Sequence, residues 1–335
     1  MKINIKHIFI GILSAFLIAG CGSKYYFEPS ESEIDGSVSY DGKINSSIDS
    51  IVRDGATLKN NQFITKYGEI PDIYLKKGGI YLNDSDDFYL TQNGNSLILI
   101  NKENKEELEI KLDGVPIGAS MDGALIAIIL ETNTLIIYDL NLMQIVFKQD
   151  NAPSPANNTL IASPHFLTDI VVLPTLDGKL VVVDKKSMQL VRNIVVNGDK
   201  YFNNVIFLSA IGNRMVAATP KRIISVSPSV INTLDANIKD VLFFEDRIFI
   251  FTSEGEVILT DRDLNEIRRK KFPFAHFSAA NAGQNIAILE TQGYMITLDT
   301  DLENSSIKRI SSEITQHTFS TIDKIFVGDR FFNIK

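Results

Sequence analysis

Three histidines occupy similar places along the chain, and they are the residues best suited to metal chemistry. His165, His276 and His317 each lie just before or within a predicted strand. If equivalent strands converge, three imidazoles could bind one metal ion together. Alternatively, each histidine holds its local geometry through hydrogen bonds. The sequence has no short cluster of histidine, cysteine and carboxylate residues, so we expect the structural role and predict no metal or cofactor.

Motifs for other kinds of catalysis are missing from the sequence. Ser120 lies between two glycines, but not at the G-x-S-x-G spacing that sets up a nucleophile. The pairs Asp261/Asp263 and Asp299/Asp301 resemble the start of a calcium loop without its glycine and distal glutamate. Aspartates that precede a turn accept backbone N–H bonds instead. We therefore predict that no residue is catalytic and that the protein is not an enzyme.

One dense basic run occurs in an otherwise acidic chain, at residues 268–271, and two phenylalanines follow it. Such a run could contact anionic lipid or an acidic partner. Alternatively, its cations protect an edge strand from aggregation. If the phenylalanines form an exposed apolar loop, they strengthen the binding interpretation. The candidate partner contacts in this segment are Arg268, Arg269, Lys270, Lys271, Phe272 and Phe274.

The longest loop-like segment within the repeats spans residues 151–158. Loops carried on a rigid scaffold supply binding function more often than its strands do. Asn157 and Asn158 are therefore two further candidate partner contacts.

The single cysteine of the chain, Cys21, follows a targeting segment. Lys2 and Lys6 precede an uncharged apolar stretch at residues 8–20, which is too short to span a bilayer and is typical of an export signal. Residues 18–21 resemble the bacterial lipobox, which implies cleavage before the cysteine and its lipidation. A buried strand that ends in a structural thiol is the alternative. Acyl chains on one residue would anchor the body to a membrane.

The resemblance to a lipobox also implies where the protein is sorted. Gly22, and not aspartate, follows the cysteine, which by analogy favours the outer membrane, with the body facing the periplasm. Residues 21–36 carry four carboxylates and one proline, so we expect a mobile tether. Its aromatic residues Tyr25, Tyr26 and Phe27 could lie among lipid headgroups or dock on the body.

The charge of the chain excludes one class of partner. The formal net charge is −8, and removal of residues 1–20 with their two lysines would leave about −10. Nucleic-acid-binding proteins need basic patches, so nucleic acid is not an expected partner. No second apolar run of 18 residues follows the signal, and no linker rich in glycine, serine and proline divides the chain.

An internal repeat supplies the elements that must position these residues. Each clear copy contains an apolar strand, a tight turn, a second strand that closes at an aspartate, and a turn into a third strand. The turns hold dipeptides such as Asp-Gly and Glu-Gly that suit left-handed backbone angles. The four clear copies span residues 125–146, 170–191, 248–268 and 286–308.

The spacing of the repeat predicts an all-β fold. Residues at the position of the closing aspartate recur every 34 to 45 residues, and units of about 40 residues with four strands indicate a β-propeller. We expect eight blades over residues 37–335, or seven because the first unit is poorly defined. The last unit lacks an outer strand, which residues 37–44 could supply to close the ring. The repeat positions are Thr65, Asn101, Asp139, Asp184, Ser227, Asp261, Asp299 and Asn333.

A propeller behind a lipobox resembles the periplasmic lipoproteins of the PQQ-like repeat superfamily. Members usually carry tryptophans in the outer strands, where this chain has residues such as Ile145 and Leu190. The resemblance implies a non-enzymatic scaffold that binds envelope proteins, including an outer-membrane protein assembly complex. The alternative is a propeller that binds a cofactor or metal, or that assists periplasmic redox or other enzyme chemistry.

Overall fold

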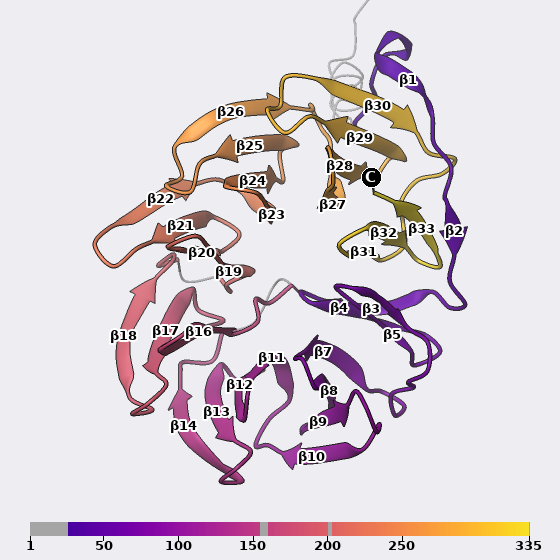
Figure 1. The fold of residues 1–335 in the computed structure, drawn as a ribbon. Coiled ribbons are helices and arrows are strands. Elements are labelled where there is room, and N and C mark those ends of the chain that lie inside the picture. The colour runs from indigo at the N-terminus through magenta and orange to yellow at the C-terminus, as the bar shows by residue number, and fades with distance from the viewer. Residues whose placement is uncertain (1–25, 155–159, 200–202, 335) are drawn as a thin grey trace, which may run out of the picture.

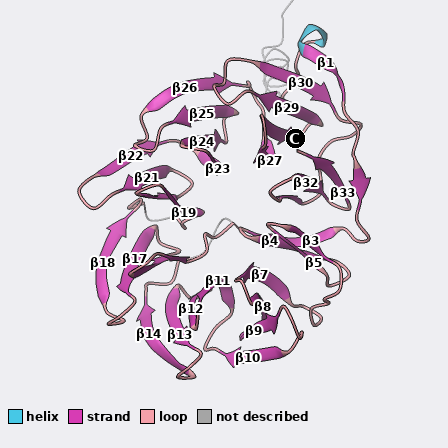
Figure 2. Cartoon of the chain, in the orientation of Figure 1, coloured by secondary structure: helices cyan, strands magenta, loops and turns pink. Residues whose placement is uncertain are grey.

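The protein was analysed as a computed structural model that describes residues 26–154, 160–199 and 203–334. These residues form eight β-sheets arranged around a common centre (Figure 1). Within this part of the chain the one helical element is the 3-10 turn η1, Glu31–Glu33 (Figure 2). None of the described helices is long and apolar enough to cross a membrane. The prediction of an all-β propeller with eight blades is confirmed.

In seven blades four antiparallel strands follow one another in chain order from the centre outwards, and in the eighth the outer strand comes from the N-terminal part of the chain. The strands of the first four blades are β3 (Ile48–Val52), β4 (Gly55–Leu58), β5 (Phe63–Thr65) and β6 (Gly68–Ile70); β7 (Ile80–Asp84), β8 (Phe88–Asn93), β9 (Ser96–Asn101) and β10 (Glu107–Lys111); β11 (Pro116–Asp122), β12 (Leu125–Leu130), β13 (Thr134–Asp139) and β14 (Gln144–Asp150); and β15 (His165–Phe166), β16 (Ile170–Pro174), β17 (Lys179–Asp184) and β18 (Leu190–Val195).

The remaining blades follow the same plan, with one strand borrowed from the N-terminal part of the chain. Their strands are β19 (Phe207–Ile211), β20 (Arg214–Ala218), β21 (Arg222–Val226) and β22 (Ile231–Asp235); β23 (Ile238–Phe244), β24 (Arg247–Thr252), β25 (Glu256–Thr260) and β26 (Glu266–Lys271); β27 (Phe277–Ala282), β28 (Ile286–Glu290), β29 (Tyr294–Leu298) and β30 (Ser305–Arg309); and β31 (Thr318–Ser320), β32 (Lys324–Val327), β33 (Arg330–Asn333) and β2 (Gly42–Lys43).

The middle strands of the blades form the core. In β12 and β17 the central residues are buried on both faces, because each blade is stacked between two neighbours. Isoleucine, leucine and valine therefore fill the gaps between blades, and each such side chain contributes about 1.5–3 kcal/mol when fully buried. Outer strands such as β18 are largely exposed. Phenylalanine and tyrosine rings such as Phe249, Phe251 and Tyr81 share this core with the aliphatic side chains, in a chain that has no tryptophan.

The repeated aspartates terminate the third strand of their blades, as expected. The carboxylate of Asp139 accepts the N–H groups of Asn141 and Leu142, at 2.8 and 3.2 Å. Asp261 likewise accepts the N–H groups of two residues in the next turn. In the preceding hairpins Asn133 and Gly178 adopt positive φ values of 66° and 81°. These residues shape turns, which is the role that the repeat predicted.

The ring closes through the N-terminal part of the chain. Strand β2 pairs antiparallel with β33, so the eighth sheet is completed by a strand from the other end of the sequence (Figure 1). Asp41 donates its N–H to the carbonyl of Phe331, and its carboxylate accepts the N–H of Asn333 at 2.7 Å. The Tyr40 ring stacks on Phe332 with centroids 4.4 Å apart. The expected closure is confirmed. The seven-blade alternative is wrong, because β3 to β6 form a full sheet.

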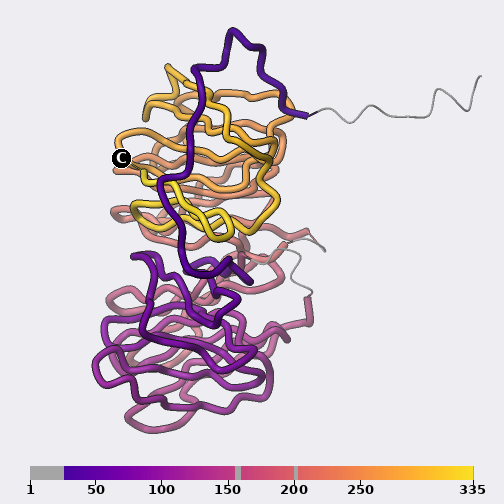
Figure 3. The backbone as a smooth tube through the Cα atoms, turned by 90° about the vertical axis from the view of Figure 1, so that its right-hand side faces the viewer, coloured from indigo at the N-terminus to yellow at the C-terminus, as the bar shows by residue number. Residues whose placement is uncertain are grey.

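The structure differs from the expected mobile tether over residues 27–36. Strand β1 (Ile34–Ser37) pairs parallel with β30 as a fifth strand of the seventh blade (Figures 1 and 3). Phe27 is buried and contacts Phe272 and Tyr294, with ring centroids 6.2 and 5.5 Å apart. An apolar side chain and a free blade edge therefore draw this polar segment onto the body. Residues 1–25, which include Cys21, lie outside the described residues.

Candidate functional site

The basic run lies on β26, the outermost strand of the sixth blade. Arg268 contacts Glu303 of the next blade at 2.9 Å. Arg269 contacts Glu256 at 2.7 Å and Glu266 at 2.8 Å, and its hydrogen bond to Glu266 raises the pKa of the guanidinium. The cations are therefore interleaved with carboxylates.

Two lysines complete this mixed surface. Lys271 contacts Glu256 at 3.3 Å, and the Lys270 ammonium donates to the backbone carbonyl of Glu303 at 3.3 Å. The side chains of these pairs are between one fifth and three fifths exposed, and ion pairs at such positions contribute little to stability. Their main effect is to order the side chains along an exposed edge, which agrees with edge protection and leaves the cations accessible to a partner.

Phe272 is not the exposed contact that the sequence suggested. Its side chain is buried and packs edge-on against Phe27 and Phe277. The docked N-terminal segment covers it, a long-range contact that the local sequence does not reveal. Phe274, in contrast, is 52% exposed and has a φ of 64°. The exposed part of this loop is therefore Pro273 and Phe274.

The end of β26 and the N-terminal segment border one hollow of about 580 Å³. Its lining carries charges of both signs: Lys270 and Lys271 from β26, and carboxylates of the N-terminal segment such as Glu33. Tyr26 and Phe274 supply exposed aromatic rings at its rim. We call β26, Phe274 and Tyr26 the edge site. It combines an unpaired strand edge, ordered cations and aromatic surface, which are features of a protein-binding surface.

The other loop candidates, Asn157 and Asn158, lie outside the described residues. The beginning of the same loop is held to its blade. The Asn151 amide donates to the carbonyl of Asn133 at 2.9 Å.

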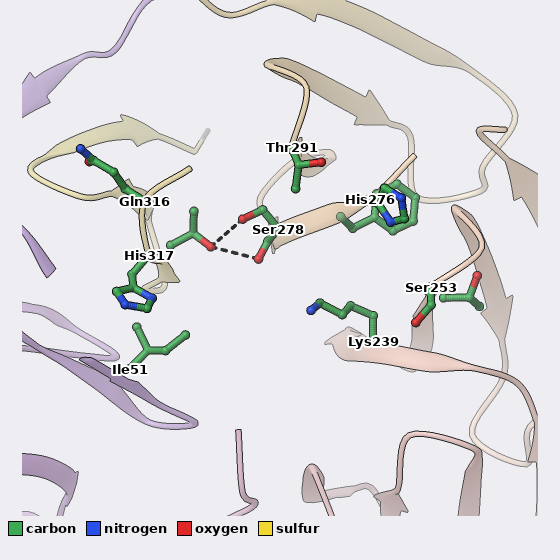
Figure 4. Close-up of a pocket in the computed structure, with 11 residues that line it drawn as sticks. Ile51, Lys239, Ser253, His276, Ser278, Thr291, Gln316 and His317 are labelled. Carbon is green, nitrogen blue, oxygen red and sulfur yellow. Dashed lines mark hydrogen bonds between the residues drawn. The ribbon is translucent and has the colours of Figure 1, made fainter. Parts of the chain in front are cut away.

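Two of the three histidines lie at one pocket near the centre of the ring. His276 precedes β27 and His317 precedes β31, and both line a hollow of about 340 Å³ (Figure 4). His165 is not among its lining residues; burial, together with the positive charge of Lys66, lowers the pKa of its imidazole. Among the described residues no group of three or more histidine, cysteine or carboxylate side chains is arranged to hold a metal ion.

A turn of the first blade reaches across the centre, a feature that our sequence reasoning missed. The Arg53 guanidinium donates to Asp240 of the sixth blade at 2.7 Å and lies 5.8 Å from the ring centroid of Phe207 in the fifth. The adjacent Asp54 forms an ion pair with Lys66 and accepts a hydrogen bond from Ser163, which precedes the fourth blade. Neighbouring residues of one turn thus connect four blades. The only local signal in the sequence is that the charged pair Arg53-Asp54 directly precedes Gly55.

Comparison with known sequences gives one group of relatives. No family model matches the chain. It is 30% identical over 340 residues to the plasminogen-binding protein PgbB of Helicobacter pylori strain J99, a match that covers 88% of this chain and 63% of that protein. PgbB of strain 26695 is similar at 30% identity over 339 residues, with 88% and 62% covered. The chain therefore spans less than two thirds of the length of these curated relatives.

Comparison with solved structures supports the architecture. BamB from Moraxella catarrhalis superposes with a TM-score of 0.66 at 12% identity, over 88% of this chain and 99% of BamB. The C-terminal WD40 domain of Sif2 superposes with a TM-score of 0.63 at 12% identity, over 90% of this chain and all of that domain. At such low identity these likenesses show the fold alone.

Proposed function

We propose that this chain is a non-enzymatic, protein-binding propeller that is held at the outer membrane by lipid on Cys21. The observation that carries the proposal is its 30% identity, over 88% of the chain, to a relative named for binding a protein, plasminogen. Plasminogen is accordingly the first partner to test. The edge site is the described surface best suited to a protein contact.

The mechanism that we propose is strand addition at a blade edge. Strand β1 already adds to the outer edge of β30, and Val38 donates its N–H to the carbonyl of Arg309 at 2.9 Å. Strand β26 is the outer strand of the neighbouring blade, and among the described residues no strand pairs with its outer edge. Main-chain hydrogen bonds would bind an extended segment there, and the side chains of β26 would select it.

The charges of β26 define which segment would bind. Arg268, Lys270 and Lys271 project from a strand whose carboxylate partners are themselves partly exposed. An extended segment with acidic side chains would compete with Glu256 and Glu303 for these cations. Extended stretches of outer-membrane proteins under assembly would be a second class of client, and the β1–β30 pairing, in which a blade edge accepts an added strand, supports this proposal.

The proposed lipid anchor would place this surface near the membrane. The described chain begins at Tyr26, five residues after Cys21, and a span of that length reaches at most about 17 Å. The buried Phe27 holds the start of the described chain beside the sixth and seventh blades. The edge site would therefore face the bilayer or a partner bound to it.

Plasminogen binding by the purified mature chain, measured by biolayer interferometry, tests the proposal. We expect saturable binding, and Arg268→Glu combined with Lys270→Glu should weaken it at least tenfold by reversing two charges of the edge site. Lys186→Glu combined with Arg192→Glu makes the same change in charge on the fourth blade and should leave binding unchanged. Absence of wild-type binding would refute plasminogen as the partner. Equal binding by both variants would refute the edge site.

A further inference from the structure

The pocket at the centre of the ring has a lining that nothing in the proposed function uses. Four blades contribute to it: the first through Ile51, the sixth through Lys239, the seventh through His276, and the eighth through His317 (Figure 4). Its volume of about 340 Å³ lies within the range of small-molecule sites. Because it is assembled from separate blades, its geometry depends on the closed ring.

The pocket presents exposed hydrogen-bond donors that have no protein partner among the described residues. Lys239 extends into the hollow between the two histidines (Figure 4). Among the described residues, no hydrogen bond or ion pair involves the Lys239 ammonium or the His276 and His317 rings. A lysine offers three N–H donors, and a neutral imidazole offers one. A ligand that accepts hydrogen bonds would satisfy these groups.

The charge of the lining has one sign. No aspartate or glutamate is among the described residues that line the pocket. The carboxylate of Glu290 lies behind the lining and is fully buried. It accepts the N–H groups of His276 and Gln292, at 3.1 and 2.7 Å, and the hydroxyl of Thr291 at 3.2 Å. Its acceptor oxygens are thus engaged by protein groups, and no ion pair joins Glu290 to Lys239 among the described residues.

Hydroxyl groups hold the two histidine-bearing strands in register. The Ser278 and Thr318 hydroxyls lie 2.9 Å apart, and Thr318 also donates to the carbonyl of Ser278 at 3.0 Å (Figure 4). These residues follow His276 and His317 closely in the chain. The spacing of the imidazoles across the pocket is therefore set by bonds between neighbouring blades, which pre-organises the site before a ligand arrives.

We propose that this pocket binds an oxyanion, a carboxylate or phosphate group carried by a small ligand. The Lys239 ammonium would pair with the anion, and the imidazoles of His276 and His317 would donate to its oxygens. Charge-assisted hydrogen bonds of this kind are about twice as strong as neutral ones. In a chain with a net charge of −8, a cationic hollow of this kind also concentrates anions locally.

Titration of the mature chain with inorganic phosphate, and separately with citrate, tests the proposal at constant ionic strength. With ¹⁵N-labelled histidine, we expect the ring signals of His276 and His317 to shift saturably with at least one probe. His165 lies outside the pocket and serves as the internal reference. A response to phosphate alone identifies a phosphate ligand, and a response to citrate alone identifies a carboxylate ligand.

A charge-removing variant separates specific binding from general salt effects. Lys239→Met keeps the length of the side chain and should raise the dissociation constant at least tenfold, whereas Lys186→Met on an exposed turn should not change it. The proposal is overturned if neither probe shifts His276 and His317. It is also overturned if the Lys239→Met chain, folded as judged by circular dichroism, binds the probes as tightly as wild type.

Discussion

At the scale of single residues, the partly buried imidazole of His165 makes the stability of the fold depend on pH. Burial lowers the pKa of His165, and the nearby Lys66 acts in the same direction while Asp54 opposes them. Below the ordinary histidine pKa of about 6.5, the unfolded chain therefore binds a proton that the folded chain does not. The contribution of His165 to the free energy of unfolding is therefore complete above this ordinary pKa. It falls as the pH drops toward the lowered pKa of the folded state.

His165→Gln should accordingly reduce the loss of stability on acidification. We expect the free energies of unfolding of variant and wild type to differ by a constant amount at pH 7.5 and 8.5, where the imidazole is neutral in both states. Between pH 6.5 and 5 the wild type should lose more stability than the variant. Urea unfolding at each pH measures this difference. Parallel pH profiles for the two proteins would disprove the role of His165.

The residue scale also separates what the sequence can predict from what it cannot. Asp139 and Asp261 were recognisable because a carboxylate at the end of a strand bonds to the turn that follows, within four residues. The role of Arg53 was not recognisable, because its partner Asp240 is 187 residues away in the sequence. Phe272 was misjudged for the same reason, since only the docked Phe27 explains its burial.

At the scale of elements, closure of the ring depends on a short segment that makes few but well-placed contacts. Strand β2 has two residues, and the contacts on either side of it strengthen the pairing with β33. The ring of Tyr40 stacks on Phe332, and the Arg330 guanidinium lies 5.2 Å from the Tyr40 centroid. The missing outer strand at the end of the repeat predicted this pairing, because a blade with three strands leaves an open edge.

Tyr40→Ala should therefore lower the free energy of unfolding by about 1–3 kcal/mol, since it removes aromatic packing at the closure. Tyr67→Ala is the matched control, because Tyr67 is 72% exposed and its loss should cost less than about 0.5 kcal/mol. Chemical denaturation of both variants provides the comparison. Equal effects would mean that the closure contributes no more to stability than an exposed tyrosine does.

Strand β1 could not be predicted from its own residues. Its sequence, Ile-Asp-Gly-Ser, is polar and shows no apolar alternation, so residues 34–36 were assigned to a tether. What makes it a strand is the unpaired outer edge of β30, which offers hydrogen-bonding groups to any extended segment held nearby. Phe27 and the ion pair between Arg309 and Glu31, at 2.9 Å, hold it there. Such a tertiary effect leaves no local pattern in the sequence.

At the scale of the whole molecule, the fold and its orientation combine into one proposal. Eight stacked blades form a rigid ring, and the docked N-terminal segment fixes the side from which the chain continues toward Cys21. The repeat made the fold predictable, whereas the proposed edge site depends on contacts between blades and on the N-terminal segment. The sequence therefore indicated only one part of the edge site, the basic run on β26.

The proposed lipidation of Cys21 would have a direct consequence for the whole molecule. Cys21→Ser should move the protein from the membrane fraction to the soluble fraction of disrupted cells, because several acyl chains are the proposed anchor. Ser23→Ala, two residues away, should stay with the membrane. Immunoblots of the two fractions measure the distribution. Firm membrane association of the Cys21→Ser protein would contradict the anchor and leave the propeller fold unaffected.

The most direct test of the central claim, that the chain is a protein-binding propeller that acts through its edge site, is photo-crosslinking in intact cells. A benzophenone amino acid would replace Lys270 on β26 and, as the control, Lys186 on the fourth blade. We predict a discrete protein adduct from position 270 that is absent from position 186 and that mass spectrometry identifies as one partner. No adduct at position 270, or the same adducts at both positions, would contradict the claim.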